Sequence, residues 1–143
     1  MGGDWYVPKL YYGYALHLQQ VQDILYNSVD FNNTHPELVN REDEYITLTS
    51  SVLDYLKEKI KLPQGLSFVF YVPEWYDRYT REYSDYDDLQ LLVVKEVKTP
   101  LSGGELSAYK LGRRQTLEMA LYALGGANVL VHEKAKFYVG FSC

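Results

Sequence analysis

The chain has 143 residues, with 14 Lys or Arg against 19 Asp or Glu, so its formal net charge is −5. This length suits one domain, and a content of 47% hydrophobic and 23% charged residues argues against intrinsic disorder, collagen and coiled coil. No apolar run reaches the roughly 20 residues that cross a bilayer, and the first residues, MGGDWYVPK, contain no apolar core of a secretory signal. We therefore expect an intracellular protein, cytoplasmic or nuclear, with no membrane partner.

The first part of the chain predicts a strand, a helix, a loop and a second helix. Residues 10–16 (LYYGYAL) are aromatic and typical of a strand, and Gly13 in their middle indicates a bulge or a close approach of another backbone. Apolar residues at helical spacing follow over 17–27, whereas residues 28–44 are rich in Asn, Asp, Thr and Pro and predict a long loop. An amphipathic helix is expected at 47–61, ended by Pro63 and Gly65.

The second part predicts two buried strands, a helix and a hairpin. Residues 66–72 (LSFVFYV) and 89–97 (LQLLVVKEV) are strands, and the LLVV core of the latter predicts a central position with both faces covered. Residues 105–111 fit either a strand or the first turns of a helix, and 113–124 predict a helix. Residues 128–132 and 136–142 are expected to form a hairpin.

This order of elements predicts a single α+β domain over residues 1–143. Its sheet is mixed or antiparallel, and two to four helices pack mainly on one face. The nearest simple template is ferredoxin-like, or a similar two-layer sandwich. Because such folds support many activities, the template implies no function.

Tyrosine is the unusual residue of this chain, with 15 of 143 positions. Its apolar ring and polar hydroxyl suit interfaces, although β-structure also favours it. The densest segment is 74–88 (EWYDRYTREYSDYDD), where tyrosines three or four residues apart predict a stripe along a helix. The stripe fits three roles: packing on the sheet, binding a protein, or forming a carboxylate or cation site, for which the rest of a calcium loop is missing. As a protein-binding surface it would use Trp75, Tyr76, Arg78, Tyr79, Arg81 and Tyr83.

A glycine turn followed by basic residues is the second candidate site. Glycines before a helix can present backbone N–H groups to a phosphate, and cations strengthen such a site. The spacing matches neither of the common nucleotide-binding glycine motifs, so a turn before a solvated helix explains it equally well. A phosphate site here would use Gly103, Gly104, Lys110, Arg113 and Arg114.

Cysteine and histidine provide little basis for metal or nucleophilic chemistry. The one cysteine is Cys143, and the three histidines, His17, His35 and His132, have no metal-binding spacing, so we expect neither a metal nor a cofactor. His17 and His132 would serve as a general acid or base only if the fold placed an acid beside them, and buried or capping roles are more usual.

No motif identifies a family, and we expect a protein-interaction module rather than an enzyme. It would bind a protein partner or itself, with a homodimer favoured, through the tyrosine-rich acidic surface. The acidic net charge argues against nucleic acid. The alternative is a small-ligand or nucleotide-phosphate binding protein, and a possible enzyme, that uses the Gly103–Gly104 turn with Arg113 and Arg114. Short, tyrosine-rich chains without a family motif are common among viral proteins, so a viral origin is a further hypothesis for this chain.

Overall fold

The computed structural model describes residues 9–63, 65–73, 89–98 and 114–142. Its main sheet contains four strands: β1 (Lys9–Leu16), β4 (Ser67–Pro73), β5 (Gln90–Val97) and β6 (Lys136–Ser142). A two-stranded sheet pairs β2 (Val39–Asn40) with β3 (Tyr45–Ile46). The α-helices of the described ranges are α1 (Leu18–Tyr26), α2 (Val29–Thr34), α3 (Ser50–Lys59) and α5 (Arg114–Ala120). Short 3-10 helices are η2 (Pro36–Leu38), η4 (Tyr122–Leu124) and η5 (Gly126–Val129), and the predicted α+β class is confirmed.

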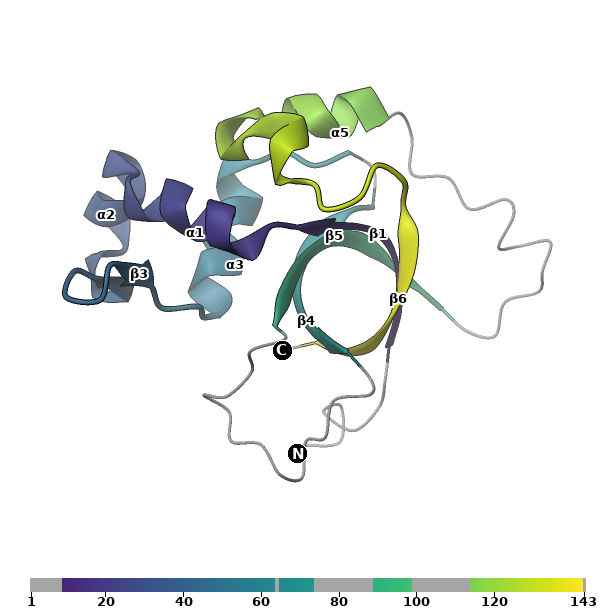
Figure 1. The fold of residues 1–143 in the computed structure, drawn as a ribbon, viewed down its shortest axis with the longest axis horizontal. Coiled ribbons are helices and arrows are strands. Elements are labelled where there is room, and N and C mark those ends of the chain that lie inside the picture. Colours follow the sequence, from purple (N-terminus) through teal and green to yellow (C-terminus); the bar gives the residue numbers. More distant parts are fainter. Residues whose placement is uncertain (1–8, 64, 74–88, 99–113, 143) are drawn as a thin grey trace.

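The main sheet closes into an antiparallel barrel of four strands, seen end-on in Figure 1. The strands lie in the order β6, β1, β5, β4, and β4 then pairs with β6 through Tyr71–Ser142, Val72–Phe141 and Pro73–Gly140. Helices separate β1 from β4 and β5 from β6, which is the βαββαβ order of a ferredoxin-like fold. The pairing of β4 with β6, which closes the sheet, is the feature that the sequence did not indicate.

Gly13 allows β1 and β5 to lie close together. A Cβ atom at this position would lie 2.3 Å from the carbonyl oxygen of Val93 and 2.7 Å from the Cα of Val94. Both of these are backbone atoms of β5, and Gly13 is in register with Val94. The close backbone approach predicted from the sequence is therefore confirmed.

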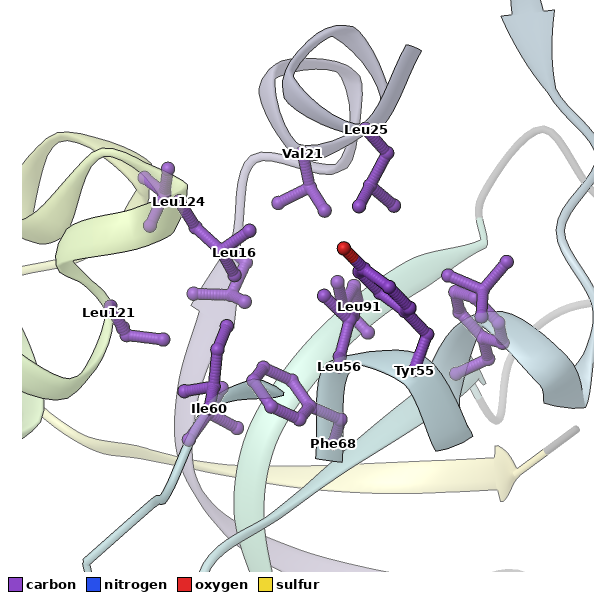
Figure 2. Close-up of a cluster of buried hydrophobic side chains, with 14 of the residues drawn as sticks. Leu16, Val21, Leu25, Tyr55, Leu56, Ile60, Phe68, Leu91, Leu121 and Leu124 are labelled. Carbon is purple, nitrogen blue, oxygen red and sulfur yellow. The ribbon is translucent and has the colours of Figure 1, made fainter. Parts of the chain in front are cut away.

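The barrel wall separates two apolar clusters. Inside the barrel lie Tyr11, Ala15, Tyr71, Leu92 and Val94, with Val69 and Tyr138 packed against them. Outside it, the strands and helices enclose a larger cluster, part of which Figure 2 shows: Leu16, Val21, Leu25, Tyr55, Leu56, Ile60, Phe68, Leu91, Leu121 and Leu124. Side chains of β5 alternate between the two clusters, since Leu91 and Val93 belong to the outer one and Leu92 and Val94 to the inner one. The prediction that this strand is covered on both faces is therefore confirmed.

Two local predictions were wrong. Residues 28–44 are not one long loop, because Ser28 caps α2 by accepting a hydrogen bond from the Phe31 N–H at 3.2 Å, and the Phe31 ring is fully buried. Residues 128–132 do not pair with β6 in a hairpin, because η5 occupies 126–129 and buries Val129 against the helices. Only Leu130 forms a β-bridge there, with Leu16.

The helices cover the barrel unevenly. In Figure 1, α1, α2 and α3 lie to the left and α5 lies above, whereas β6 runs along the right-hand side of the barrel. Among the described residues, no helix has the length and apolar character needed to span a membrane. Of the described helices, none lies along the β6 side of the barrel in this view.

Candidate functional site

Most residues of the two predicted sites lie outside the described ranges. These are Trp75, Tyr76, Arg78, Tyr79, Arg81 and Tyr83 of the tyrosine-rich segment, and Gly103, Gly104, Lys110 and Arg113 of the glycine turn. One residue of the predicted sites, Arg114, lies within the described ranges. Its Nε donates a hydrogen bond to Glu118 Oε1 at 2.7 Å, and its Nη1 donates one to the His132 carbonyl at 3.2 Å. Its guanidinium also lies 5.5 Å from the centre of the Tyr14 ring. Arg114 thus holds α5 against β1 and the segment before β6, and its phosphate-binding role stays a prediction.

One barrel surface carries exposed apolar side chains. Tyr11 and Tyr138 point into the barrel, so their neighbours along β1 and β6 point outward. We call the outward set the β1–β6 face: Leu10, Tyr12, Phe137 and Val139. Phe137 and Val139 are 43% and 42% exposed, and the rings of Phe137 and Tyr12 contact each other with centroids 4.5 Å apart. The face is thus a continuous aromatic and aliphatic surface across two strands.

The charge of the barrel strands differs from that of the rest of the chain. The four strands together contain three lysines, Lys9, Lys95 and Lys136, and one acidic residue, Glu96. Lys95 is in register with Tyr12, which places it on the same outer surface as the β1–β6 face. Residues 17–61, which form α1 to α3, have eight acidic and four basic residues, a net charge of −4. The barrel strands thus have a net charge of +2 in an acidic protein, and Lys95 is the lysine that strand alternation places on the surface of the β1–β6 face.

A pocket of about 240 Å³ opens at one end of the barrel. Its lining comes from the end of β1, the start of β5, the segment before β6 and β6 itself: Ala15, Leu16, His17, Leu18, Leu89, Gln90, Val131, His132 and Tyr138. The fold thus brings together His17 and His132, which are far apart in sequence. No Asp or Glu is among these lining residues, so within the described chain the acid needed for a charge-paired catalytic histidine is missing from the pocket.

The Tyr138 hydroxyl is unusual because it is buried without a hydrogen-bond partner within the described residues. Burial raises the pKa of this phenol, and the Ala15 backbone beside it acts in the opposite direction without reaching hydrogen-bond geometry. The neighbouring Tyr71 differs, since its hydroxyl donates to the Val139 carbonyl at 2.7 Å. A buried hydroxyl without a partner costs free energy unless something else bonds to it.

A polar cluster between α2 and α3 has a structural role. The Tyr55 hydroxyl donates to Asp30 Oδ2 at 2.7 Å, and Lys59 Nζ lies 3.4 Å from the same oxygen. The hydrogen bond from Tyr55 lowers the pKa of Asp30, and Lys59 adds to this effect. The rings of Phe31 and His35 stack at 5.3 Å and both meet Tyr55 edge-on. These contacts fasten α2 to α3.

Comparison with known proteins gives no relative for this chain. No family model, curated protein or solved structure matches it. Within the described residues, no group of three or more His, Cys, Asp or Glu side chains is placed to hold a metal ion. The candidate sites therefore rest on the geometry of the chain alone.

Sequence reasoning missed the residues that the structure singles out. The alternation in KFYVGFS could have placed Phe137 and Val139 on one face of a strand, but no local pattern indicates that none of the described helices covers this face. No sequence pattern marked Gln90 and Tyr138 as site residues, because only the pairing of strands distant in sequence brings them to the pocket.

Proposed function

We propose that this chain is a protein-interaction module rather than an enzyme, and that it binds a second copy of itself. The observation that carries the proposal is the β1–β6 face. In the proposed dimer this face of one copy receives the tyrosine-rich segment 74–88 of the other. The exchange is reciprocal, as in the twofold-symmetric dimers that are the commonest oligomers.

The apolar content of the face supports binding to protein. Single exposed apolar residues are normal on a surface, but contiguous patches usually mark interaction sites. Here Phe137 contacts Tyr12, and both Phe137 and Val139 are more than two-fifths exposed. Aromatic residues are enriched at the centres of interfaces because they bury a large area at a low entropy cost.

Charge complementarity supports segment 74–88 as the occupant. The four barrel strands contain three lysines and one glutamate, a net charge of +2. Segment 74–88 contains six acidic residues and two arginines, a net charge of −4, together with four tyrosines and Trp75. Opposite charges around an aromatic contact steer association and define its register. A second copy of the chain therefore offers, in its segment 74–88, the aromatic rings and acidic groups that the β1–β6 face would bind.

The test is the molar mass in solution, measured by sedimentation equilibrium over a range of concentrations. We expect the parent chain to dimerise and the double variant Phe137→Ser/Val139→Ser to dissociate at least tenfold more readily, since truncation of an interface anchor costs on the order of 2 kcal/mol. Tyr79→Ser tests the proposed occupant and should weaken the dimer similarly. The matched control is Tyr122→Ser, because Tyr122 is 84% exposed on η4 and lies outside the β1–β6 face.

Two results would contradict the proposal. One is a parent chain that stays monomeric at the highest concentration measured. The other is equal weakening by the control Tyr122→Ser, which would show that general surface apolarity drives association. Raised salt should weaken the dimer, because exposed charges separated by more than about 8 Å are screened at physiological ionic strength.

A further inference from the structure

Strand β6 is held in the barrel mainly by its backbone. It pairs with β1 through five residue pairs and with β4 through three. Its side chains before residue 141 contribute less, because Lys136, Phe137 and Val139 are exposed and Gly140 has none. Strand β5 differs, since its four successive side chains Leu91–Val94 are fully buried. Over these positions β6 therefore adds a single side chain to the apolar core.

Tyr138 is that side chain, and its burial is only partly compensated. Its ring packs on the inner cluster and meets the Tyr71 ring edge-on at 5.8 Å. Its hydroxyl is buried without a hydrogen-bond partner within the described chain, which costs free energy. The Tyr71 hydroxyl adds a contact from β4 by donating to the Val139 carbonyl at 2.7 Å. These contacts belong to strand pairing, so any copy of β6 in the same place can make them.

A short segment joins β6 to the chain that follows η5. Before it, the Val131 N–H donates to the Ala15 carbonyl at 2.9 Å, and after it Lys136 is in register with Gly13. Residues 132–135, which we call the hinge, form neither helix nor strand and are exposed or half-buried. Both ends of the hinge thus lie along β1, beside positions roughly 7 Å apart. When extended, the five residue steps across the hinge span about 17 Å, enough to carry β6 away from its own barrel.

We propose that β6 is an exchangeable strand, and that two copies of this chain form a dimer in which β6 of each copy completes the barrel of the other. The exchanged strand makes the same backbone pairs and side-chain contacts, because the two sequences are identical. The closed and exchanged forms therefore differ in the hinge and in the association of two chains. Exchange of an identical element is, for this reason, an accessible route to a dimer.

Strand exchange makes the β1–β6 face a joint surface of two chains. One copy supplies Leu10 and Tyr12, and the other supplies Phe137 and Val139. Exchange requires no docking of segment 74–88, so the inference does not rest on the proposed function.

The charges of the hinge suit a twofold dimer. Glu133 and Lys134 are both exposed and adjacent. Extended hinges that cross antiparallel about a twofold axis can bring Glu133 of one copy opposite Lys134 of the partner, and symmetry then forms the pair twice. Opposite charges placed in this way define the register of the crossing.

The experiment detects β6 of one chain in the barrel of another by disulfide trapping. Cys143 is the one cysteine of the chain, so a Cys143→Ser background removes competing thiols. One sample carries Tyr12→Cys and a second carries Phe137→Cys. These positions are in register, and their rings lie with centroids 4.5 Å apart, so cysteines there are within disulfide reach. After co-incubation at high concentration and oxidation, we expect a disulfide-linked heterodimer on non-reducing electrophoresis, with a yield that grows with the time of co-incubation.

The matched control replaces Phe137→Cys by Val139→Cys. The two side chains are 43% and 42% exposed, but Val139 is in register with Leu10 rather than with Tyr12. Chance collisions, or contact between two β1–β6 faces, would trap both pairs equally. Strand exchange should favour the pair of Tyr12→Cys with Phe137→Cys several-fold, because a diagonal neighbour lies about 2–3 Å farther away. Equal yields, or no heterodimer after prolonged co-incubation, would overturn the proposal.

A shortened hinge tests the route from the other direction. Deletion of Glu133 and Lys134 removes two exposed side chains and leaves the net charge unchanged. Short hinges under strain favour exchange, so we expect the trapped fraction to rise at least about twofold. A trapped fraction that is unchanged or lower, in a variant whose circular dichroism matches that of the parent, would contradict exchange through this hinge.

The results also separate this inference from the proposed function. A dimer in sedimentation that gives no heterodimer by trapping refutes strand exchange and leaves the docking of segment 74–88 standing. A dimer that persists with Tyr79→Ser and still gives the heterodimer supports strand exchange and contradicts that docking.

Discussion

Substitution of Gly13 by alanine should destabilise the barrel far more than its single added methyl suggests. The new Cβ would lie 2.3 Å from the Val93 carbonyl oxygen, about 1 Å short of the roughly 3.3 Å that a carbon–oxygen contact requires. The atoms it meets belong to the β5 backbone, where Val93 and Val94 are fully buried, so neither can move aside without moving the strand. Overpacking costs about 1–3 kcal/mol, and two weakened ladder hydrogen bonds add about 1 kcal/mol each. We expect a loss of about 3–5 kcal/mol, a large part of a typical stability of 5–15 kcal/mol.

The assay is urea unfolding followed by circular dichroism, with Gly65→Ala as the matched control. Gly65 has a φ of +71°, but a Cβ there would meet only the end of the Lys95 side chain, at 3.4 Å. Its substitution should therefore cost only the left-handed backbone strain, about 1–2 kcal/mol. A Gly13→Ala midpoint shift no larger than that of Gly65→Ala would refute the close β1–β5 approach.

Three further predictions concern the core and its tyrosines. Leu92→Ala should cost about 2–4 kcal/mol in urea unfolding, because this fully buried side chain lies inside a narrow barrel that cannot collapse around the cavity. Tyr55→Phe should destabilise the chain less than Leu92→Ala, and an NMR titration should show the pKa of Asp30 rise once the hydrogen bond that lowers it is lost. Burial raises the pKa of Tyr14, Tyr55 and Tyr138 above the ordinary value of 10.0. Their contribution to stability should be complete below about pH 10 and fall as the pH rises through the folded-state values, so a urea midpoint that does not fall between about pH 9 and 11 would contradict these assignments.

The elements that sequence predicts well are those whose hydrophobic pattern is local. The alternation or continuity of apolar residues over 10–16, 66–72 and 89–97 identifies β1, β4 and β5, and helical spacing identifies α1 and α3. The segment 28–44 is different, because its polar composition conceals Phe31, which is buried against residues of another helix. A single buried ring in a polar stretch produces no periodic signal.

The candidate sites could be predicted only in part, for a different reason. The alternation of 136–142 is visible in the sequence, but the exposure of Phe137 depends on where the helices pack. The pocket needs β1, β5 and β6 to be paired before His17, Gln90 and His132 meet. Pairing between strands so distant in sequence leaves no trace in the spacing of neighbouring residues.

The closure of the barrel by β6 also has a consequence for how the chain folds. Residue 10 pairs with 139, and residue 73 pairs with 140, so the closing contacts join segments far apart in sequence. Forming such contacts costs more loop-closure entropy than forming the β4–β5 contacts, and long-range pairing slows folding. Until β6 docks, β1 and β4 each present an unpaired edge that another chain can extend. We therefore expect refolding to show a slow step that ends with β6 docking, and aggregation to compete with folding mainly before that step.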